Sequence, residues 1–165
     1  MPVGVGYDVH RLAPGRRLVL GGVELASDLG LLGHSDADVA THAIMDALLG
    51  AAALGDIGQH FPPTDERYAG ARSVDLLRAV AALLGRHGWR VGNVDVTVVA
   101  EQPRIGPHVP EMRRQLSDAI GIDRARVSVK ATTNEGLGAI GRGEGIAAFA
   151  VAEIVASSER SERHG

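Results

Sequence analysis

Three stretches of the chain carry apolar side chains three or four positions apart, the spacing that places them on one face of an amphipathic helix. They are residues 35–54, 73–87 and 107–121. The first helix is expected to begin at Ser35, because Ser35 and Asp38 are spaced like the two members of a capping box. The pattern therefore predicts three helices.

Other stretches have the character of strands. Residues 93–100 (NVDVTVVA) alternate between apolar and polar, and residues 3–9 alternate as well. Residues 126–131 and 146–156 are rich in valine, isoleucine or alanine, and residues 17–20 form a shorter apolar run. These segments predict about four core strands and one short additional strand.

Glycine-rich segments at residues 30–33, 55–70 and 132–145 separate these elements and are expected to be loops. The chain has no internal repeat and no linker. The predicted fold class is α/β (α+β), a single domain with a mixed sheet of about four core strands packed against helices. The domain is expected to span residues 1–157, followed by a polar tail at residues 158–165.

Composition narrows the classes of function. Hydrophobic residues make up 45% of the chain, charged residues 22%, and the net charge is −3, so neither nucleic acid nor an anionic membrane is an expected partner. Aromatic residues make up only 3%, which predicts an aliphatic core. The N-terminal residues do not resemble a signal peptide, and no apolar run reaches the roughly 18 residues that span a bilayer. A cytoplasmic protein is therefore expected.

The absence of cysteine excludes disulfides and cysteine-ligated zinc, so a metal site would have to use histidines and carboxylates. Asp8 and His10 lie two positions apart in a predicted strand and point to the same side. Asp38, His42 and Asp46 lie at positions i, i+4 and i+8 of a predicted helix and share one face. These residues fit either solvated polar surfaces or a catalytic metal site, in which one Asp and two His leave a fourth position open.

Two further motifs fit phosphate binding. Residues 130–135 (KATTNE) end a predicted strand, where hydroxyls and backbone amides can hold a phosphate and Glu135 can hold a hard cation such as Mg²⁺. Residues 141–145 (GRGEG) place Arg142, a planar anion binder, between glycines. Each motif taken alone is also compatible with an ordinary polar turn.

Five segments run in order from residue 4 to residue 147: GVGYDVHRL, GLLGHSDADVATHAIMDALLGAAALGDIGQHFP, NVDVTVVAEQPRIGPH, VKATTNEGLG and GRGEGIA. Together they closely resemble the 2-C-methyl-D-erythritol 2,4-cyclodiphosphate synthase family of the non-mevalonate isoprenoid pathway. The resemblance implies a homotrimeric enzyme whose active sites are shared between neighbouring subunits.

The resemblance also implies roles for individual residues. Asp8, His10 and His42 would hold a divalent ion, with zinc the expected metal, and the open position would take a phosphate oxygen. Glu135 would help to place a second ion, Mg²⁺ or Mn²⁺, at the substrate diphosphate. The implied catalytic residues are His34 and Thr133.

The substrate is implied to be a small cytidine diphosphate compound. Residues 100–106 would hold the cytosine, and Arg142 would contact a phosphate or line the assembly axis. The full set of implied substrate contacts is Asp8, Val9, His10, His34, Ser35, Asp56, Ile57, Gly58, Phe61, Pro62, Pro63, Thr64, Asp65, Ala100, Glu101, Gln102, Pro103, Arg104, Ile105, Gly106, Ala131, Thr132, Thr133, Asn134, Glu135, Ala139 and Arg142.

The implied reaction is attack by the 2-phosphate of 4-diphosphocytidyl-2-C-methyl-D-erythritol 2-phosphate on its own β-phosphorus, with CMP leaving. Two residues depart from the family pattern: Pro63 stands where an acidic residue is expected, and Ala139 stands where an aromatic ring is common. Two other functions stay open. One is a metal-dependent phosphohydrolase with Asp38 or Asp46 as general base, and the other is a non-catalytic trimer that binds isoprenoid phosphates.

Overall fold

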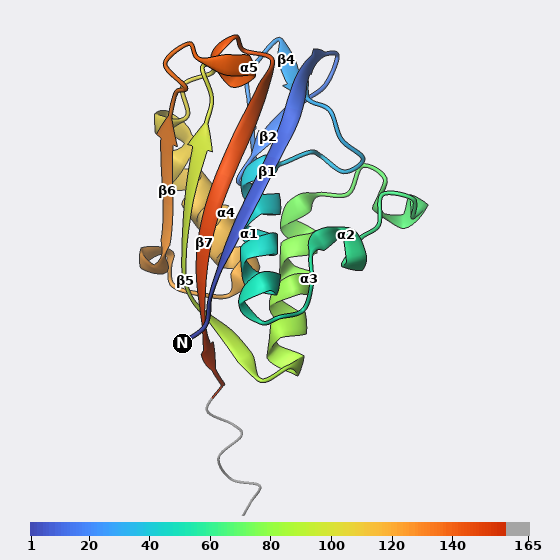
Figure 1. Cartoon of the computed structure of the whole chain (residues 1–165), viewed down its shortest axis with the longest axis vertical. Helices are drawn as coiled ribbons and strands as arrows, with labels where there is room; N and C mark the ends of the chain where they lie inside the picture. The colour runs from blue at the N-terminus through green and yellow to red at the C-terminus, as the bar shows by residue number, and fades with distance from the viewer. Residues whose placement is uncertain (158–165) are drawn as a thin grey trace, which may run out of the picture.

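Five strands form one mixed sheet in the order β4-β1-β7-β5-β6 (Figure 1). The computed structural model describes residues 1–157, and the expected tail at residues 158–165 lies outside the described residues. β5 and β6 run parallel, whereas β1 is antiparallel to β4 and β7, and β5 is antiparallel to β7. The predicted mixed sheet packed against helices is confirmed, with β4 as a short fifth strand at the edge.

The sheet strands are β1 (Val3–Pro14), β4 (Leu29–Leu31), β5 (Trp89–Val99), β6 (Val127–Thr132) and β7 (Gly145–Ala156). A separate hairpin consists of β2 (Leu18–Leu20) and β3 (Val23–Leu25). The helices are α1 (Val39–Ala51), α2 (Ile57–His60), α3 (Ser73–Arg86), α4 (Val109–Ile120) and α5 (Gly138–Gly141). Short 3₁₀ turns are η1 (Glu66–Tyr68), η2 (Gly106–His108) and η3 (Arg124–Arg126). The longest helix in residues 1–157 has 14 residues, and none combines the length and apolar character that crossing a bilayer requires.

The helices α1, α3 and α4 cover one face of the sheet (Figure 1). α1 lies directly against β1 because β1 carries glycine where the two approach: a Cβ added at Gly4 would lie 2.0 Å from the Ala47 carbonyl oxygen, and one at Gly6 would lie 1.9 Å from that of Ala43. Only glycine allows a backbone to come so close. This contact fixes the position of β1 relative to α1.

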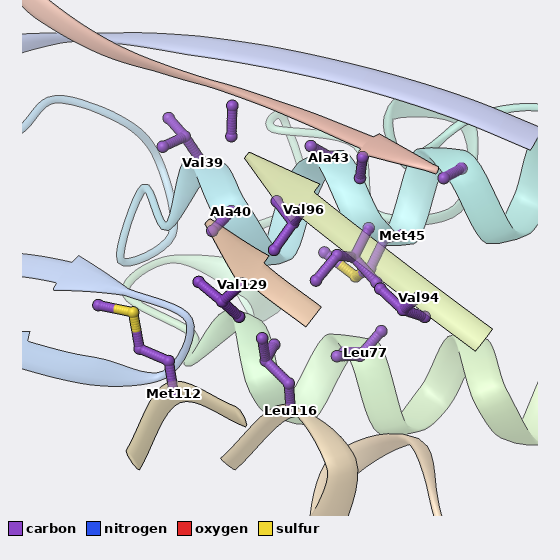
Figure 2. Close-up of a cluster of buried hydrophobic side chains, with 14 of the residues drawn as sticks. Val39, Ala40, Ala43, Met45, Leu77, Val94, Val96, Met112, Leu116 and Val129 are labelled. Carbon is purple, nitrogen blue, oxygen red and sulfur yellow. The ribbon is translucent and has the colours of Figure 1, made fainter. Parts of the chain in front are cut away.

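The core between sheet and helices is aliphatic, as the low aromatic content predicts. Figure 2 shows Val94 and Val96 of β5 and Val129 of β6 facing side chains from α1, α3 and α4. All these side chains are buried. Removing this apolar surface from water stabilises the fold by about 25 cal/mol for each Å² buried.

Three local predictions were wrong. α1 begins at Val39 rather than at Ser35, because Asp38 is its N-cap and accepts the Thr41 amide. Residues 30–33 were expected to be a loop, but Gly30 and Leu31 belong to β4, which pairs with an unexpectedly long β1. The expected loops at residues 55–70 and 132–145 contain the short helices α2, η1 and α5.

Candidate active site

One carboxylate and two imidazoles converge where β1 meets the first turn of α1. Asp8 and His10 point to the same side of β1, and His42 approaches them from α1. The Asp8 Oδ2 atom lies 3.2 Å from His10 Nε2 and 2.9 Å from His42 Nδ1. One ligand atom from each residue lies within 4.8 Å of the others. Two imidazole nitrogens and one carboxylate oxygen with an open side fit a catalytic divalent metal.

The charges in this cluster are strongly coupled. Burial raises the pKa of the Asp8 carboxyl, but the hydrogen bonds and charges of His10 and His42 outweigh burial and hold that pKa well below its usual range. The hydrogen bond to Asp8 raises the pKa of His10, and burial only partly opposes this shift. A cation, whether protons on the imidazoles or a metal ion, is therefore favoured beside Asp8.

The backbone orients the His10 ring. Its Nδ1 atom contacts the Leu32 carbonyl oxygen in the segment that follows β4. A carbonyl can only accept, so Nδ1 carries a proton and donates, and Nε2 is left to hold either a second proton or a metal ion beside Asp8. Hydrogen bonds of this kind hold metal-binding histidines in the required orientation.

Asp38 and Asp46, which were predicted to share a helix face with His42, do not join the cluster. Asp38 is fully buried and accepts the amides of Gly21 and Gly22 at 2.9 and 2.7 Å. It also accepts the amide and the hydroxyl of Thr41, at 3.1 and 2.6 Å. Asp46 accepts the Ile57 amide at 2.8 Å and so anchors α2. Both carboxylates are engaged in holding backbone segments in place.

A cavity of about 210 Å³ opens beside the cluster. Besides Asp8 and His10, six of the expected substrate residues line it together with His42. Three lining residues were not anticipated: Met45, Tyr68 and Leu76. Tyr68 packs edge-on against Phe61 with ring centroids 5.3 Å apart. The full lining is Asp8, His10, His34, Ser35, His42, Met45, Ile57, Gly58, Phe61, Pro63, Tyr68 and Leu76.

Several residues expected to contact substrate lie outside this lining. Val9 points to the opposite side of β1 from Asp8 and is exposed. Asp56 caps α2 by accepting the Gln59 amide at 3.0 Å. Asp65 caps η1 and pairs with Arg67 at 2.6 Å. The remaining two, Pro62 and Thr64, belong to the same segment between α2 and η1.

A second cavity, of about 360 Å³, brings the segment after β5 against the end of β6. The Glu101 carboxylate accepts the Asn134 amide at 2.7 Å and ties the two segments together. Gln102 lines a neighbouring hollow with Glu101. The residues that line the second cavity are Ala100, Glu101, Pro103, Arg104, Ile105, Gly106, Pro107, Ala131, Thr132 and Thr133.

The loop after β6 is exposed. Glu135 adopts a left-handed backbone with φ of 52°, and its amide donates to the Thr133 hydroxyl at 3.2 Å. Ala139 lies in α5 and is exposed, and Arg142 forms an ion pair with Glu144 at 2.6 Å. None of these residues lines the cavity beside Asp8, and within the described chain no residue lines both cavities.

Comparison with known proteins identifies the family. The YgbB family model matches residues 1–155. The chain belongs to the YgbB family. It is 66% identical over 154 residues to the 2-C-methyl-D-erythritol 2,4-cyclodiphosphate synthase of Symbiobacterium thermophilum, covering 93% of this chain and 98% of that protein.

Two solved structures share the fold. A 2C-methyl-D-erythritol-2,4-cyclodiphosphate synthase bound to CDP superposes with a TM-score of 0.85 at 37% identity, covering 93% of this chain and 99% of that one. The CDP complex of IspF from Plasmodium falciparum gives a TM-score of 0.83 at 33% identity, covering 95% and 97%. Membership of the YgbB family thus agrees with the resemblance that the five sequence segments carry.

Little in the sequence indicates that Met45, Tyr68 and Leu76 line the cavity of this YgbB-family site. Met45 and Leu76 lie at apolar positions of α1 and α3, where the helical pattern is equally well explained by the core. Tyr68 was available as a signal, because it is one of two tyrosines in the chain and lies three residues after Asp65, an expected substrate contact. The sequence number of a residue does not show which side chains face it across a cavity.

Proposed function

We propose that this chain converts 4-diphosphocytidyl-2-C-methyl-D-erythritol 2-phosphate to 2-C-methyl-D-erythritol 2,4-cyclodiphosphate and CMP. The observation that carries the proposal is the cluster of Asp8, His10 and His42 at the wall of a cavity, in a chain of the YgbB family. The names of the most similar relatives support the same activity. The reaction needs no protein nucleophile, because one phosphate of the substrate attacks another.

Charge is the main obstacle to this reaction, since two anionic phosphates must approach each other in line. A zinc ion at the cluster would supply positive charge to a phosphate oxygen. Asp8, His10 and His42 would hold that ion, and His34, which lines the same cavity, would donate to the charge that develops on phosphate. Glu135 would hold a second ion, Mg²⁺ or Mn²⁺, because its carboxylate is a hard oxygen ligand.

The second cavity would bind the cytidine part of the substrate. The relatives whose structures were solved with CDP support a cytidine nucleotide as ligand. Residues 100–106 offer backbone groups to the cytosine, and Thr133 at the cavity wall would contact phosphate. Binding both ends of the substrate brings its reacting phosphates together, which lowers the entropic part of the barrier.

A homotrimer would join the two cavities, because they share no lining residue within one chain. The sheet face opposite the helices supports such an assembly. Its β1 and β7 part exposes apolar side chains, with Val5 70% and Val3 60% exposed. The other exposed apolar residues there are Tyr7, Val9, Phe149 and Val151.

The same face is polar on β5 and β6, where Lys130 and Asp95 form an ion pair at 2.6 Å. Cross-strand register places Tyr7, Phe149, Thr97 and Lys130 in one row, so the character of the face changes from apolar to polar along that row. A cyclic trimer joins two different patches at each interface. A sheet face with one apolar half and one polar half is therefore compatible with a three-fold assembly.

Incubation with the cytidyl substrate, followed by phosphorus NMR, tests the proposed function. We expect CMP and a cyclic diphosphate, and we expect both to disappear when a chelator removes divalent ions and to return when zinc and Mg²⁺ are restored. A linear phosphate product would instead identify a phosphohydrolase. The engagement of Asp38 and Asp46 by backbone amides argues against either as the general base of such an enzyme.

A further inference from the structure

A chain of buried and half-buried polar groups lies behind His42, on the side of the ring away from Asp8. The His42 Nε2 atom lies 2.9 Å from the hydroxyl of Ser73, the first residue of α3. The Ser73 hydroxyl in turn contacts the Asp36 carboxylate, and the Ser73 amide donates to the other oxygen of that carboxylate at 3.0 Å. Ser73 is fully buried, so solvent does not compete for its hydroxyl.

The direction of these hydrogen bonds follows from the chemistry of the groups. A carboxylate only accepts, so the single proton of the Ser73 hydroxyl points to Asp36. The Ser73 oxygen then presents lone pairs to His42, and Nε2 must carry the hydrogen that lies between them. The Ser35 hydroxyl oxygen, 3.2 Å from Nε2, already accepts the Ala37 amide and offers Nε2 a further acceptor.

From this arrangement we infer that Asp36, acting through Ser73, fixes the tautomer and orientation of His42 and thereby prepares its Nδ1 atom to bind a metal. Nδ1 is the nitrogen that faces Asp8, at 2.9 Å. With the hydrogen held on Nε2, Nδ1 offers its lone pair to an ion shared with Asp8 and His10. Asp36 and Ser73 are positioning residues, and the inference rests on the metal site proposed above.

A purely structural role makes a different prediction. Asp36 also accepts the Ser73 amide at the start of α3, and its own amide donates to the Ala71 carbonyl at 3.1 Å. If the chain of groups only joined α3 to the segment before α1, its loss would lower the free energy of unfolding and leave the zinc affinity of the folded protein unchanged. A positioning role requires that the affinity itself falls.

The Asp36→Asn variant separates these roles because it keeps the shape of the side chain. Its amide oxygen can still accept the Ser73 amide, while its NH₂ group takes the place of Oδ1 and donates to the Ser73 hydroxyl oxygen. The Asp38 amide, which lies 3.3 Å from Oδ1 in the wild type, loses that acceptor, so the stability of each variant is measured as well. The Ser73 proton then turns toward His42 Nε2 and favours the tautomer with hydrogen on Nδ1, which cannot bind a metal. We expect zinc affinity, measured by competition with a chelator, to fall about 10- to 100-fold, the range typical of outer partners of metal ligands.

Ser73→Ala should weaken zinc binding by a similar factor. Ser117→Ala is the matched control, because Ser117 is also buried and its hydroxyl donates to the Arg114 carbonyl in α4, on a different helix. We expect that variant to bind zinc as the wild type does. Circular dichroism and thermal unfolding of each metal-free variant report any loss of packing.

Nitrogen-15 NMR of the zinc-loaded wild type gives a second readout that needs no variant. We expect the His42 Nε2–H resonance to be present and slow to exchange with water, and to exchange faster in Ser73→Ala. An unprotonated Nε2 in the loaded wild type would overturn the inference, as would unchanged zinc affinity in both Asp36→Asn and Ser73→Ala. A wild type that binds no zinc would instead refute the proposed metal site.

Discussion

Three aspartates in or beside α1 differ in environment, and the environment determines what each can do. Asp8 has two imidazoles beside it and a carboxylate oxygen directed toward the cavity. Asp38 is enclosed by four donors, and Asp46 holds the first amide of α2. The same residue type thus serves as a candidate metal ligand in one place and as a backbone anchor in the other two.

Replacing His42 by Ala should remove bound zinc and abolish turnover while the fold is retained, because an open metal site contributes little to folding compared with the core. Elemental analysis should give stoichiometric zinc for the wild type and a value near zero for the variant. His87→Ala is the control, because His87 lies exposed at the end of α3. Stoichiometric zinc in His42→Ala would show that His42 is not a ligand.

The pair of Asp8 and His10 predicts a pH dependence in the metal-free protein. The pKa of His10 is raised in the folded state by Asp8. Its contribution to the free energy of unfolding is therefore fully present below the pKa of the unfolded chain and is lost as pH rises through the folded pKa. Protons compete with zinc for Nε2, so zinc affinity should fall with decreasing pH, starting above the ordinary range of histidine.

An NMR titration of the His10 ring in the metal-free protein checks this prediction. The midpoint should lie above that of the same histidine in the urea-unfolded chain, and His10→Gln should remove the corresponding part of the pH dependence of unfolding. A midpoint equal to or below the unfolded value would mean that Asp8 does not stabilise the charged ring.

At the scale of elements, distant segments decide where α1 begins. The spacing of Ser35 and Asp38 predicted a start at Ser35, but Asp38 is the N-cap and accepts the Thr41 amide. Asp38 prevails because the amides of the β2–β3 turn also bind its carboxylate, a contact that the local pattern does not contain. β4 was not predicted for a similar reason. This edge strand has only three residues, and it pairs only with the end of β1, which extends to Pro14.

Asp38→Ala should destabilise the protein by roughly 3 kcal/mol, because loss of a helix N-cap costs about 1 kcal/mol and unpaired buried donors cost about 1–3 kcal/mol more. Urea unfolding of the metal-free protein measures this change. Asp56→Ala, which removes the exposed cap of the four-residue helix α2, is a control that should cost far less. Equal costs for the two variants would argue against the anchoring role of Asp38.

The sequence was informative about the long elements, because strand and helix periodicity constrain which side chains share a face. Periodicity paired Asp8 with His10 and grouped Asp38, His42 and Asp46, whereas the set of Asp8, His10 and His42 came from the family resemblance. The sequence could not reveal that the carboxylates of Asp38 and Asp46 bind backbone amides instead of joining the cluster, because those amides lie in the β2–β3 turn and at the start of α2. Nor could it place Met45 and Leu76 at the cavity, because core positions and cavity walls carry the same apolar side chains.

At the scale of the whole molecule, one chain presents two separate cavities, which we propose are two halves of a site shared between subunits, and a sheet with an exposed apolar face. His42→Ala disables the metal half, and a Thr133 variant disables the half that would bind the nucleotide. Each should be inactive alone. If sites are shared around a three-fold axis, refolding the two together in equal amounts should restore about a quarter of wild-type activity, because one neighbouring pair in four combines two intact halves.

Recovery requires that the mixture be unfolded first, and mixing the folded variants serves as the control. Each variant should run as a trimer in analytical ultracentrifugation. If the refolded mixture stays inactive although trimers form, each site is contained within one subunit, and the shared arrangement is wrong.

The proposed reaction requires that a phosphate of the substrate, and not water, attacks the β-phosphorus. The most direct measurement is to run the reaction in water enriched in heavy oxygen and to follow the phosphorus NMR shifts of both products. Intramolecular attack predicts a cyclic diphosphate and CMP that contain no heavy oxygen, in a reaction that stops when zinc is removed. Heavy oxygen on phosphorus in a linear product would contradict the account.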